Sequence, residues 1–354
     1  MIDSSDLQSI SILVTGGTGS FGKAFVKYAL RQLHPKKLVV FSRDELKQFQ
    51  MRQEYPVESF PNLRFFIGDV RDRDRLYRAL DGVDLVIHAA ALKQVPACEY
   101  NPLEAIKTNV LGAANLIDAA IDHNVKNVMA LSTDKAANPV NLYGATKLCS
   151  DKLFVAANAY SGLHDTRFSV VRYGNVVGSR GSVIPYFLAQ RPQGYLTITD
   201  TRMTRFLITL ESAVEFVVRC IARMMGGEIF VPKIPSVRVT DLARVIAPEC
   251  EQRMIGIRPG EKLHEVMAPD DDAHLTLEFN DYFVIQPSHT FWNRKDYMTN
   301  SLGKPCPDGF RYSSDNNSWW LTDEQISKLV EEVKSGPQIG IAPRPDEPQF
   351  IVGG

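Results

Sequence analysis

One short segment of the chain holds residues whose types and spacing suit the transfer of a proton and a hydride. Tyr143 and Lys147 lie four residues apart, and therefore on one face of a helix. A lysine ammonium beside a phenol lowers the pKa of the phenol from about 10, which predicts that Tyr143 removes a proton from an alcohol or sugar hydroxyl. Thr133 stands ten residues before Tyr143, at the end of an apolar run, and could bond to the same hydroxyl. Asp134 and Lys135 follow directly, although hydride transfer alone needs neither charge.

A glycine-rich loop near the N-terminus predicts a dinucleotide that would accept the hydride. The segment Thr15–Gly22 reads TGGTGSFG and lies between an apolar, β-branched run and a helical pattern. Its glycines permit a tight turn and a close approach of the backbone to a pyrophosphate, and the free N–H groups of the following helix face the anion. The predicted binding residues of this loop are Gly16, Thr18, Gly19, Ser20, Phe21 and Gly22.

The residues after the second apolar run favour NADP as the cofactor. An NAD site usually has a carboxylate about 20 residues past the last glycine, where it binds the ribose 2′-hydroxyl. Ser42 and Arg43 occupy this position here, and a hydroxyl with a guanidinium suits a 2′-phosphate. Lys47 could supply a second cation, and Glu45 belongs to the same predicted site. The alternative is a solvated turn of mixed charge.

Further residues that contact the cofactor are expected at the ends of later strands. Asp69 and Val70 follow the third strand and are placed to meet the adenine. Small residues after the fourth strand leave room beneath the cofactor. The remaining candidates are Ala89, Ala90, Ala91, Lys93, Thr108, Tyr143, Lys147 and Asn175.

Strand-like and helix-like segments alternate over the first half of the chain. Apolar runs follow the N-terminal one at Lys36–Ser42, Leu63–Asp69, Val83–Ala91, Asn127–Thr133 and Phe168–Gly178, with helical patterns such as Leu103–His123 and Tyr143–Ser161 between them. This alternation predicts an α/β fold with a Rossmann-like, doubly wound parallel sheet. The carboxyl ends of the strands, which carry the residues above, then meet at one edge of the sheet, where ligands bind.

Beyond Gly178 the pattern becomes irregular, which predicts a smaller mixed α/β region for substrate binding. Residues 10–178 are assigned to the NADP-binding domain, and residues 206–227, with a helix at Glu211–Met225, are expected to return to it. Residues 179–205 and 228–335 are assigned to the substrate-binding region. Residues 336–354 form a tail rich in proline and glycine.

The composition is that of a globular protein with one large domain or two packed ones. The chain has 354 residues, of which 44% are hydrophobic and 23% are charged. A net charge of −1 gives no sign of a nucleic-acid or anionic-membrane partner. The five cysteines form no CxxC pair, and no apolar run approaches the roughly 20 residues of a membrane span. The N-terminus does not look like a secretory signal, so we expect a cytoplasmic protein.

Several motifs together resemble the extended short-chain dehydrogenases/reductases. These are T-G-x-x-G-x-x-G, a Ser/Thr before Tyr-x-x-x-Lys, and RYGNVVG at Arg172–Gly178. The run STDKAANPVNLYGATKL, with SRDELKQ, HAAALK, GNVVGSRGSV, RMTRF and RPGEKLHE, closely resembles the inverting UDP-N-acetylglucosamine 4,6-dehydratases that begin pseudaminic acid synthesis. The resemblance implies NADP, a UDP-N-acetylglucosamine substrate, and a homo-oligomer, with a hexamer as the form that the family suggests.

This resemblance gives Asp134 and Lys135 a role in the removal of water. Oxidation at sugar carbon 4 makes a ketone that acidifies the hydrogen on carbon 5, and the hydroxyl then leaves carbon 6, to which the hydride returns. Lys135 is the predicted base at carbon 5, with a pKa lowered by Lys147, the nicotinamide cation and burial. Asp134 is the predicted acid for the leaving hydroxyl, with a pKa raised by burial. The alternative is an exposed ion pair that contributes under about 1 kcal/mol.

The resemblance also assigns residues to the nucleotide sugar. Arg180–Ile184 would form a substrate loop, and Arg205, Arg258 and Glu261 would contact the nucleotide end. The complete predicted set is Lys93, Thr133, Tyr173, Asn175, Arg180, Gly181, Ser182, Val183, Ile184, Arg205, Arg258 and Glu261. Each arginine could instead form a structural ion pair, and Tyr173 could be a core residue. His88 and His264 have no partner at metal-binding spacing, so no metal is expected.

Two other functions stay open. The chain could be another nucleotide-sugar enzyme of the same fold, either a 4-epimerase or a retaining 4,6-dehydratase. Loss of water and the configuration at carbon 5 separate these enzymes from an inverting dehydratase. The chain could also be a regulator that binds NADP without catalysis, although the complete set of Thr133, Tyr143 and Lys147 argues against that reading.

Overall fold

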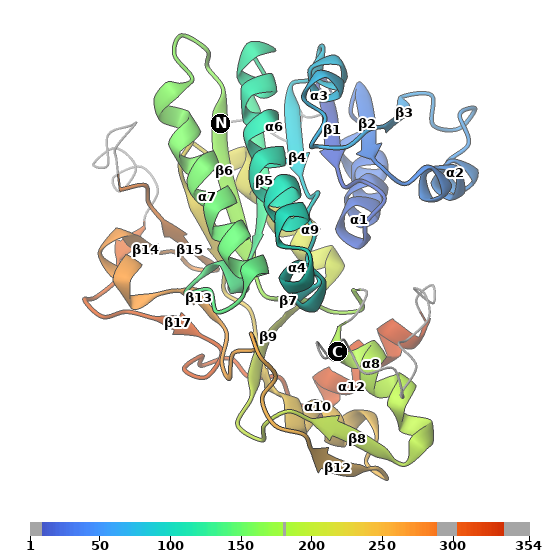
Figure 1. Ribbon diagram of the computed structural model, residues 1–354, viewed down its shortest axis with the longest axis vertical. Helices are drawn as coiled ribbons and strands as arrows, with labels where there is room; N and C mark the ends of the chain where they lie inside the picture. Colours follow the sequence, from blue (N-terminus) through green and yellow to red (C-terminus); the bar gives the residue numbers. More distant parts are fainter. Residues whose placement is uncertain (1–8, 180–181, 289–302, 336–354) are drawn as a thin grey trace.

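A ten-stranded sheet forms the centre of the protein in the computed structural model, which describes residues 9–179, 182–288 and 303–335 (Figure 1). The strands follow the order β16-β14-β15-β10-β6-β5-β4-β1-β2-β3. The seven strands from β10 to β3 pair in parallel, whereas β15, β14 and β16 are antiparallel to their neighbours. The predicted α/β fold with a doubly wound parallel sheet is confirmed. The bounds are β1 Ser11–Thr15, β2 Lys37–Ser42, β3 Leu63–Ile67, β4 Leu85–His88, β5 Asn127–Thr133, β6 Arg167–Tyr173, β10 Ile229–Pro232, β14 Thr276–Glu278, β15 Tyr282–Ile285 and β16 Lys304–Pro305.

Helices cover both faces of the sheet. On one face α1 (Ser20–Tyr28) packs against α9 (Leu210–Arg223), and on the other α3 (Arg73–Leu80), α6 (Gly112–Asp122) and α7 (Leu142–Tyr160) lie side by side, with α6 and α7 in front in Figure 1. Shorter helices connect these layers, namely α2 (Glu45–Glu54), α4 (Val95–Tyr100) and α5 (Pro102–Ile106). A π-helical turn joins α5 to α6, which gives the long helical run that the sequence predicts from Leu103.

The central strands are buried on both faces, as parallel strands between two helix layers must be. Every residue of β1 and β4 is buried, as are all but one residue of β2, β5 and β6. Their apolar sequences are therefore nearly continuous rather than alternating. Because these strands run in the same direction, their carboxyl ends, including Thr15, Thr133 and Tyr173, lie along one edge of the sheet.

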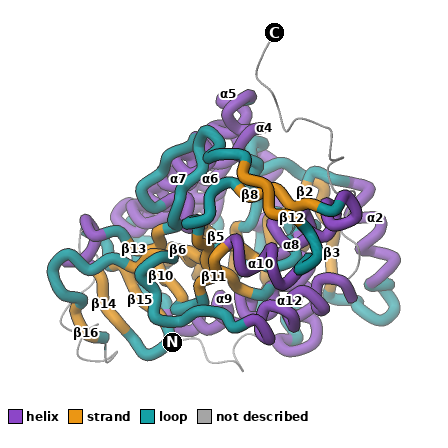
Figure 2. The backbone as a smooth tube through the Cα atoms, turned by 90° about the horizontal axis from the view of Figure 1, so that it is seen from below, coloured by secondary structure: helices purple, strands orange, loops and turns teal. Residues whose placement is uncertain are grey.

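A smaller region lies at that edge, below the sheet in Figure 1. It contains α8 (Val183–Gln190), α10 (Val239–Ile246), α12 (Asp323–Ser335) and the paired strands β8 (Tyr195–Ile198) and β12 (Glu251–Met254). A second hydrophobic core that includes Phe187, Leu196, Leu242 and Ile326 holds these elements together. Figure 2, viewed from below, shows the helices of this region on one side of the molecule and β14, β15 and β16 on the other.

Two short sheets connect the smaller region to the central one. Strand β7 (Asn175–Val176) continues from β6 after a bend at Gly174 and pairs with β9 (Thr204–Ile208), which in turn pairs with β11 (Ser236–Arg238). The predicted strand Phe168–Gly178 is therefore divided into two. Strand β13 (Val266–Ala268) pairs with β17 (Tyr312–Ser313).

Some residues predicted to belong to the smaller region extend the central sheet instead. Strands β10, β14, β15 and β16 fall within residues 228–335, yet all four pair in the ten-stranded sheet. The buried run of β10 pairs in parallel with β6, and β15 then covers the other edge of β10. The division of the chain into two functional regions stays a prediction, and its proposed tail, 336–354, lies outside the described residues.

No helix in the described ranges combines the length and apolar character needed to cross a membrane.

Candidate active site

A cleft of about 410 Å³ lies where the glycine-rich loop, the ends of β4, β5 and β6, and the start of α7 come together. The structure brings into this one cleft residues that the sequence predicts from five separate segments. The predicted residues that line it are Gly16, Gly19, Ser20, Phe21, Gly22, Ala89, Ala91, Lys93, Thr133, Asp134, Lys135, Tyr143, Lys147, Tyr173, Asn175 and Ser182.

The glycine-rich loop is packed too closely for side chains. Gly16 has a φ of +64°, and a Cβ there would lie 2.8 Å from the backbone nitrogen of Ala90. A Cβ on Gly22 would lie 2.5 Å from Cα of Gly17 and 2.6 Å from the carbonyl oxygen of Gly16. Helix α1 begins within this segment, at Ser20, with Gly19 as its N-cap. This bare backbone at a helix N-terminus fits the pyrophosphate of a dinucleotide.

The predicted 2′-phosphate site has one exposed cation at the end of β2. About half of the Arg43 side chain (51%) is exposed, and its Nη1 lies 3.6 Å from Oδ2 of Asp69. Ser42 is buried, and its hydroxyl accepts a hydrogen bond from Gln48, so the structure directs it into the protein. Lys47 is bonded to Asp44, which caps α2 through the backbone N–H of Lys47. Of the three side chains, that of Arg43 is therefore the best placed to meet a 2′-phosphate.

Residues predicted to meet the adenine lie at the end of β3. Asp69 accepts hydrogen bonds from the backbone and side chain of Arg71. Burial raises the pKa of Asp69, but Arg71 and Arg43 lower it by more than burial raises it, so the net shift is downward. Val70 is buried against Gly112. Thr108 is buried in the π-helical turn before α6, where its hydroxyl has no partner within the described residues.

A close backbone contact fixes α7 against the turn that carries Asp134 and Lys135. Asn141 caps α7 by accepting the backbone N–H of Gly144 at 2.8 Å. A Cβ on Gly144 would overlap the carbonyl oxygen of Lys135, so only glycine lets α7 approach the turn that carries Asp134 and Lys135. Thr133 caps this turn, which continues from β5. The glycine after Tyr143 thus places the phenol beside the acid and the amine.

The pKa of Tyr143 differs from the prediction. Burial raises the pKa of Tyr143 to about 12, and the nearby Lys135 ammonium offsets this rise only in part. The predicted lowering of the pKa of this phenol is therefore wrong, because Tyr143 is almost completely buried and burial outweighs the nearby cation. Burial lowers the pKa of Lys147 itself, against the opposing effect of Asp151. Tyr173, which stacks on Phe21 with ring centroids 6.3 Å apart, also has its pKa raised by burial.

Asp134 and Lys135 form an ion pair whose carboxylate is buried and whose amine is partly exposed. The Nζ of Lys135 donates to Oδ1 of Asp134 at 3.0 Å, and the hydroxyl of Thr133 donates to the same oxygen at 2.8 Å. The Asp134 side chain is 1% exposed. Burial and the charge of Glu265 raise the pKa of Asp134, which agrees with the predicted direction. The alternative of an exposed ion pair is wrong, because Asp134 has almost no contact with solvent.

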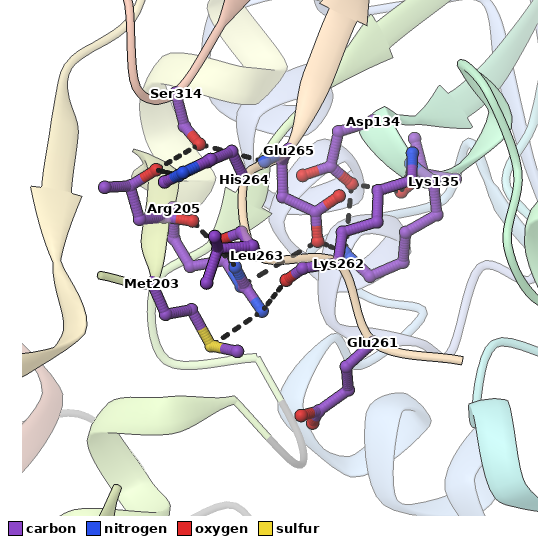
Figure 3. A network of polar contacts seen from close by, with 12 residues as sticks. Asp134, Lys135, Met203, Arg205, Glu261, Lys262, Leu263, His264, Glu265 and Ser314 are labelled. Atoms are coloured by element: carbon purple, nitrogen blue, oxygen red, sulfur yellow. Dashed lines mark hydrogen bonds and ion pairs between the residues drawn. The ribbon is translucent and has the colours of Figure 1, made fainter. Parts of the chain in front are cut away.

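The predicted pKa shift of Lys135 has the wrong sign. Burial alone lowers the pKa of Lys135, but the carboxylates of Asp134 and Glu265 more than offset burial and hold it above its ordinary value. Glu265 lies 3.2 Å from the Lys135 Nζ through its Oε1 (Figure 3). The resting side chain is therefore an ammonium. Sequence reasoning missed Glu265, although the RPGEKLHE segment that contains it is part of the resemblance.

Arg205 is engaged by the protein rather than directed into the cleft. Its guanidinium donates to the carbonyl oxygens of Thr204 at 2.7 Å, Lys262 at 3.1 Å and Leu263 at 3.2 Å. Its Nε also lies 3.8 Å from Oε1 of Glu265 (Figure 3). The structure thus favours the alternative reading of Arg205 as a structural cation, which holds the segment before β13 against β9.

The other residues assigned to the substrate fall into different environments. Arg258 and Glu261 face each other at 3.8 Å, and Glu261 points away from the network around Lys135 in Figure 3. Ile184 is buried in the second core and Val183 packs against it, so neither directs its side chain into the cleft. Ser182 and Asn175 line the cleft, and each has a buried oxygen without a partner in the described part of the chain. Arg180 and Gly181 lie outside the described residues.

The two histidines considered in the sequence form hydrogen bonds within the protein. Nδ1 of His88 is bonded to the hydroxyl of Thr15 at 2.9 Å, and burial lowers the pKa of His88 to about 3. Nδ1 of His264 is bonded to the hydroxyl of Thr204 at 2.8 Å. In the described part of the chain, no group of three or more His, Cys, Asp or Glu side chains is arranged to hold a metal ion.

Comparison with known proteins places these features in a family. The profile of the family described as "Polysaccharide biosynthesis protein" matches residues 12–287. This chain belongs to that family, within the extended short-chain dehydrogenases/reductases. A family member from Campylobacter jejuni, named UDP-N-acetylglucosamine 4,6-dehydratase (inverting), is 55% identical over 330 residues, which is 92% of this chain and 98% of that protein. Another from Rickettsia akari, named UDP-glucose 4-epimerase, is 44% identical over 90% of this chain and 95% of its own.

Solved structures support the same fold. Pen from Bacillus thuringiensis has a TM-score of 0.83 and 36% identity, over 92% of this chain and 98% of that one. The dTDP-glucose 4,6-dehydratase DesIV from Streptomyces venezuelae, solved with NAD bound, has a TM-score of 0.64 and 26% identity over 72% of this chain and 87% of its own. The chain thus shares its fold with enzymes that act on nucleotide sugars.

Proposed function

We propose that this protein is an inverting UDP-N-acetylglucosamine 4,6-dehydratase that uses NADP. The reaction converts the substrate to UDP-2-acetamido-2,6-dideoxy-β-L-arabino-hex-4-ulose and water. The observation that carries this proposal is the Asp134–Lys135 pair, which lies in one cleft with Tyr143 and the glycine-rich loop. An oxidoreductase that only moves a hydride needs no acid and amine at this place, and an elimination needs both. The name of the Campylobacter jejuni relative supports the same substrate and outcome.

The glycine-rich loop, Arg43 and Lys147 would hold the cofactor. The crowded glycines leave only backbone to meet a pyrophosphate, and Arg43 suits a 2′-phosphate, which supports NADP rather than the NAD that DesIV holds. When bound, the cofactor accepts a hydride from sugar carbon 4 and later returns it to carbon 6. Because the hydride returns to the same molecule of sugar, the overall reaction consumes no cofactor.

Tyr143 would take the proton from the 4-hydroxyl during the oxidation. Its pKa of about 12 in the protein alone makes it a weak acid, so it needs cationic neighbours to ionise. Lys135 already acts in this direction, and Lys147 lines the same cleft. Thr133, at the end of β5, is placed to orient the same hydroxyl.

A single proton shift would prepare Asp134 and Lys135 for the elimination. In the resting protein Lys135 is an ammonium, and its Nζ lies 3.0 Å from Oδ1 of Asp134. When the pair is an ammonium and a carboxylate, movement of one proton along this contact gives an uncharged amine and a protonated acid. Burial opposes the charges of both side chains and so favours this uncharged form, whereas the charge of Glu265 favours the proton on Lys135. The amine then removes the carbon 5 proton, and Asp134 protonates the hydroxyl that leaves carbon 6 as water.

The identity of the product tests this proposal directly. The purified protein is incubated with UDP-N-acetylglucosamine and NADP, and the product is followed by mass spectrometry and NMR. We expect a loss of about 18 mass units, which corresponds to one water from each sugar, and an L configuration at carbon 5. Retention of mass with an inverted carbon 4 would instead identify a 4-epimerase, as the Rickettsia akari relative is named. Loss of water without inversion would identify a retaining dehydratase, and no turnover would favour a binding protein.

Three further features belong to the proposal. We expect a cytoplasmic protein, a homo-oligomer such as a hexamer, and a place at the start of pseudaminic acid synthesis. The first follows from the sequence, and the other two follow from its resemblance to the inverting dehydratases. Sedimentation of the purified protein tests the oligomeric state.

A further inference from the structure

Glu265 gives the Lys135 amine a second carboxylate partner. Its backbone is held on both sides by Ser314, whose hydroxyl accepts the Glu265 N–H at 2.9 Å and whose own N–H donates to the Glu265 carbonyl at 2.8 Å. The Glu265 side chain is only 3% exposed, and its Oε1 lies 3.2 Å from Nζ of Lys135. A buried carboxylate is costly unless it is paired, so this contact is a specific feature of the fold.

Charged groups from two other segments and from its own segment face this carboxylate. Asp134 shares the Lys135 amine with it at 3.0 Å, Arg205 on β9 lies 3.8 Å away, and Lys262 stands three residues before it (Figure 3). Lys262 also donates to the carbonyl oxygen of Ala137, directly after the catalytic turn. The cluster therefore holds two carboxylates and three cations, with Lys135 as the cation that contacts both carboxylates.

The two carboxylates of the cluster are placed in opposite electrostatic environments. Burial and the charge of Glu265 raise the pKa of Asp134. Burial also raises the pKa of Glu265, but Lys135, Arg205 and Lys262 together lower it below its ordinary value. Two neighbouring carboxylates whose pKa values are shifted in opposite directions can take different roles in a reaction. The site thus favours the protonated form of Asp134 and the charged form of Glu265.

We propose that Glu265 is a positioning residue for the dehydration, which anchors the Lys135 amine and supplies the fixed negative charge beside the Asp134–Lys135 pair. One of its oxygens holds the amine at the cleft, and the positive charge of Arg205 and Lys262 keeps it ionised through the reaction. The mobile proton is then confined to Asp134 and Lys135. This inference rests on the proposed role of that pair.

Loss of the Glu265 charge has a defined effect on the pH dependence. A negative neighbour raises the pKa of both Asp134 and Lys135, so its removal lowers both values. The active state, with a protonated acid and an uncharged amine, is bounded by these two titrations. Both limbs of the pH–rate profile therefore move to lower pH when the charge is removed. A role in folding alone would reduce the rate without moving the profile.

The test compares the rate of water loss from UDP-N-acetylglucosamine between pH 5 and 10 for the wild type and three variants. Glu265→Gln keeps the shape of the side chain and removes its charge, and we expect its rate maximum to move down by about one pH unit or more. Glu265→Asp keeps the charge, so its maximum should stay at the wild-type position even if the rate falls. Glu249→Gln is the matched control, since Glu249 is an exposed carboxylate paired with Arg191 at 2.6 Å.

The outcomes separate this inference from the proposed function. An unmoved profile for Glu265→Gln, or a profile of Glu265→Asp that moves as far as that of Glu265→Gln, would overturn the role of Glu265. If Glu265→Gln does not fold, as judged by circular dichroism, a Glu265→Asp maximum that moves down by about one pH unit or more would overturn the role of Glu265. A wild-type protein that loses no water from the sugar nucleotide would refute the proposed function itself, before any variant is compared.

Discussion

Replacement of Lys135 by methionine should abolish dehydration while leaving the fold and the cofactor site intact. The change removes the amine that we assign as the carbon 5 base and keeps a side chain of similar length. A positioned acid or base contributes about 10²- to 10⁴-fold to a rate. Because Lys135 also shares its proton with Asp134, the loss should fall at the upper end of this range, near about 10⁴-fold.

The same variant should lose a measurable amount of stability. Breaking a buried ion pair costs about 3–5 kcal/mol, but Lys135 is 26% exposed and Arg205 remains near Glu265, so we expect about 2 kcal/mol. Unfolding entropy near 2.1 cal/mol/K per residue gives roughly 0.7 kcal/mol/K for a chain of this length. The melting temperature should therefore fall by about 3 °C.

The stability loss should depend on pH in a defined direction. In the native protein the pKa of Asp134 is raised, and the loss of the Lys135 ammonium raises it further. A group whose pKa is raised in the native state stabilises the folded protein at low pH. This stabilisation is lost as the pH rises from the pKa of the unfolded state, about 4, through the pKa of the native state. The gap in melting temperature between wild type and Lys135→Met should therefore widen from pH 5 to pH 8.

Turnover by mass spectrometry, nucleotide release on denaturation and thermal unfolding at both pH values together test this variant. Lys233→Met is a matched control, because Lys233 is 27% exposed and paired with Glu278 at 2.7 Å, outside the residues that line the cleft. We expect this control to dehydrate the substrate normally. Dehydration by Lys135→Met at the wild-type rate would refute the assignment of the base, whatever its melting temperature.

Three further substitutions test other parts of the structure. Gly144→Ala should displace the carbonyl of Lys135 and lower turnover at least about tenfold while the nucleotide stays bound, and unchanged turnover would contradict the close contact of α7 with the catalytic turn. Arg43→Ala should weaken NADP binding about tenfold or more in titrations but leave NAD binding nearly unchanged, and equal losses for both would count against a 2′-phosphate site. Arg172→Met should cost about 3 kcal/mol, or about 4 °C in melting temperature, because it leaves the buried Asp151 carboxylate without its cation at 3.2 Å, and an unchanged melting temperature would show that this pair does not stabilise the fold.

Local patterns predicted the parallel sheet well because each central strand carries its own signal. The predicted bounds of β5, Asn127–Thr133, agree with the structure, and the strand at Lys36–Ser42 differs by one residue. The pairing of strands is not local in the same way. Nothing near Ile229–Pro232 indicates that this run lies beside β6, so the sequence assigned it to the smaller region.

In the candidate site, too, local patterns predicted which residues take part but not the electrostatic effects of residues far along the chain. Thr133, Tyr143 and Lys147 could be found because strand and helix periodicity bring them together over a short distance in the chain. The sign of the Lys135 pKa shift could not be predicted in this way, because it depends on Glu265, which stands 130 residues later. Arg205 was likewise predicted as a phosphate ligand from its residue type, whereas three backbone carbonyls engage its guanidinium.

The most direct test of the dehydratase proposal is the fate of the hydrogen on carbon 5. The protein is incubated with UDP-N-acetylglucosamine and NADP in heavy water, and the product is examined by NMR. Removal of the carbon 5 proton by an enzymatic base followed by reprotonation on the other face predicts deuterium at carbon 5, an L configuration there, and protium delivered to carbon 6. A 4-keto-6-deoxy product that keeps protium or the D configuration at carbon 5 would contradict the account.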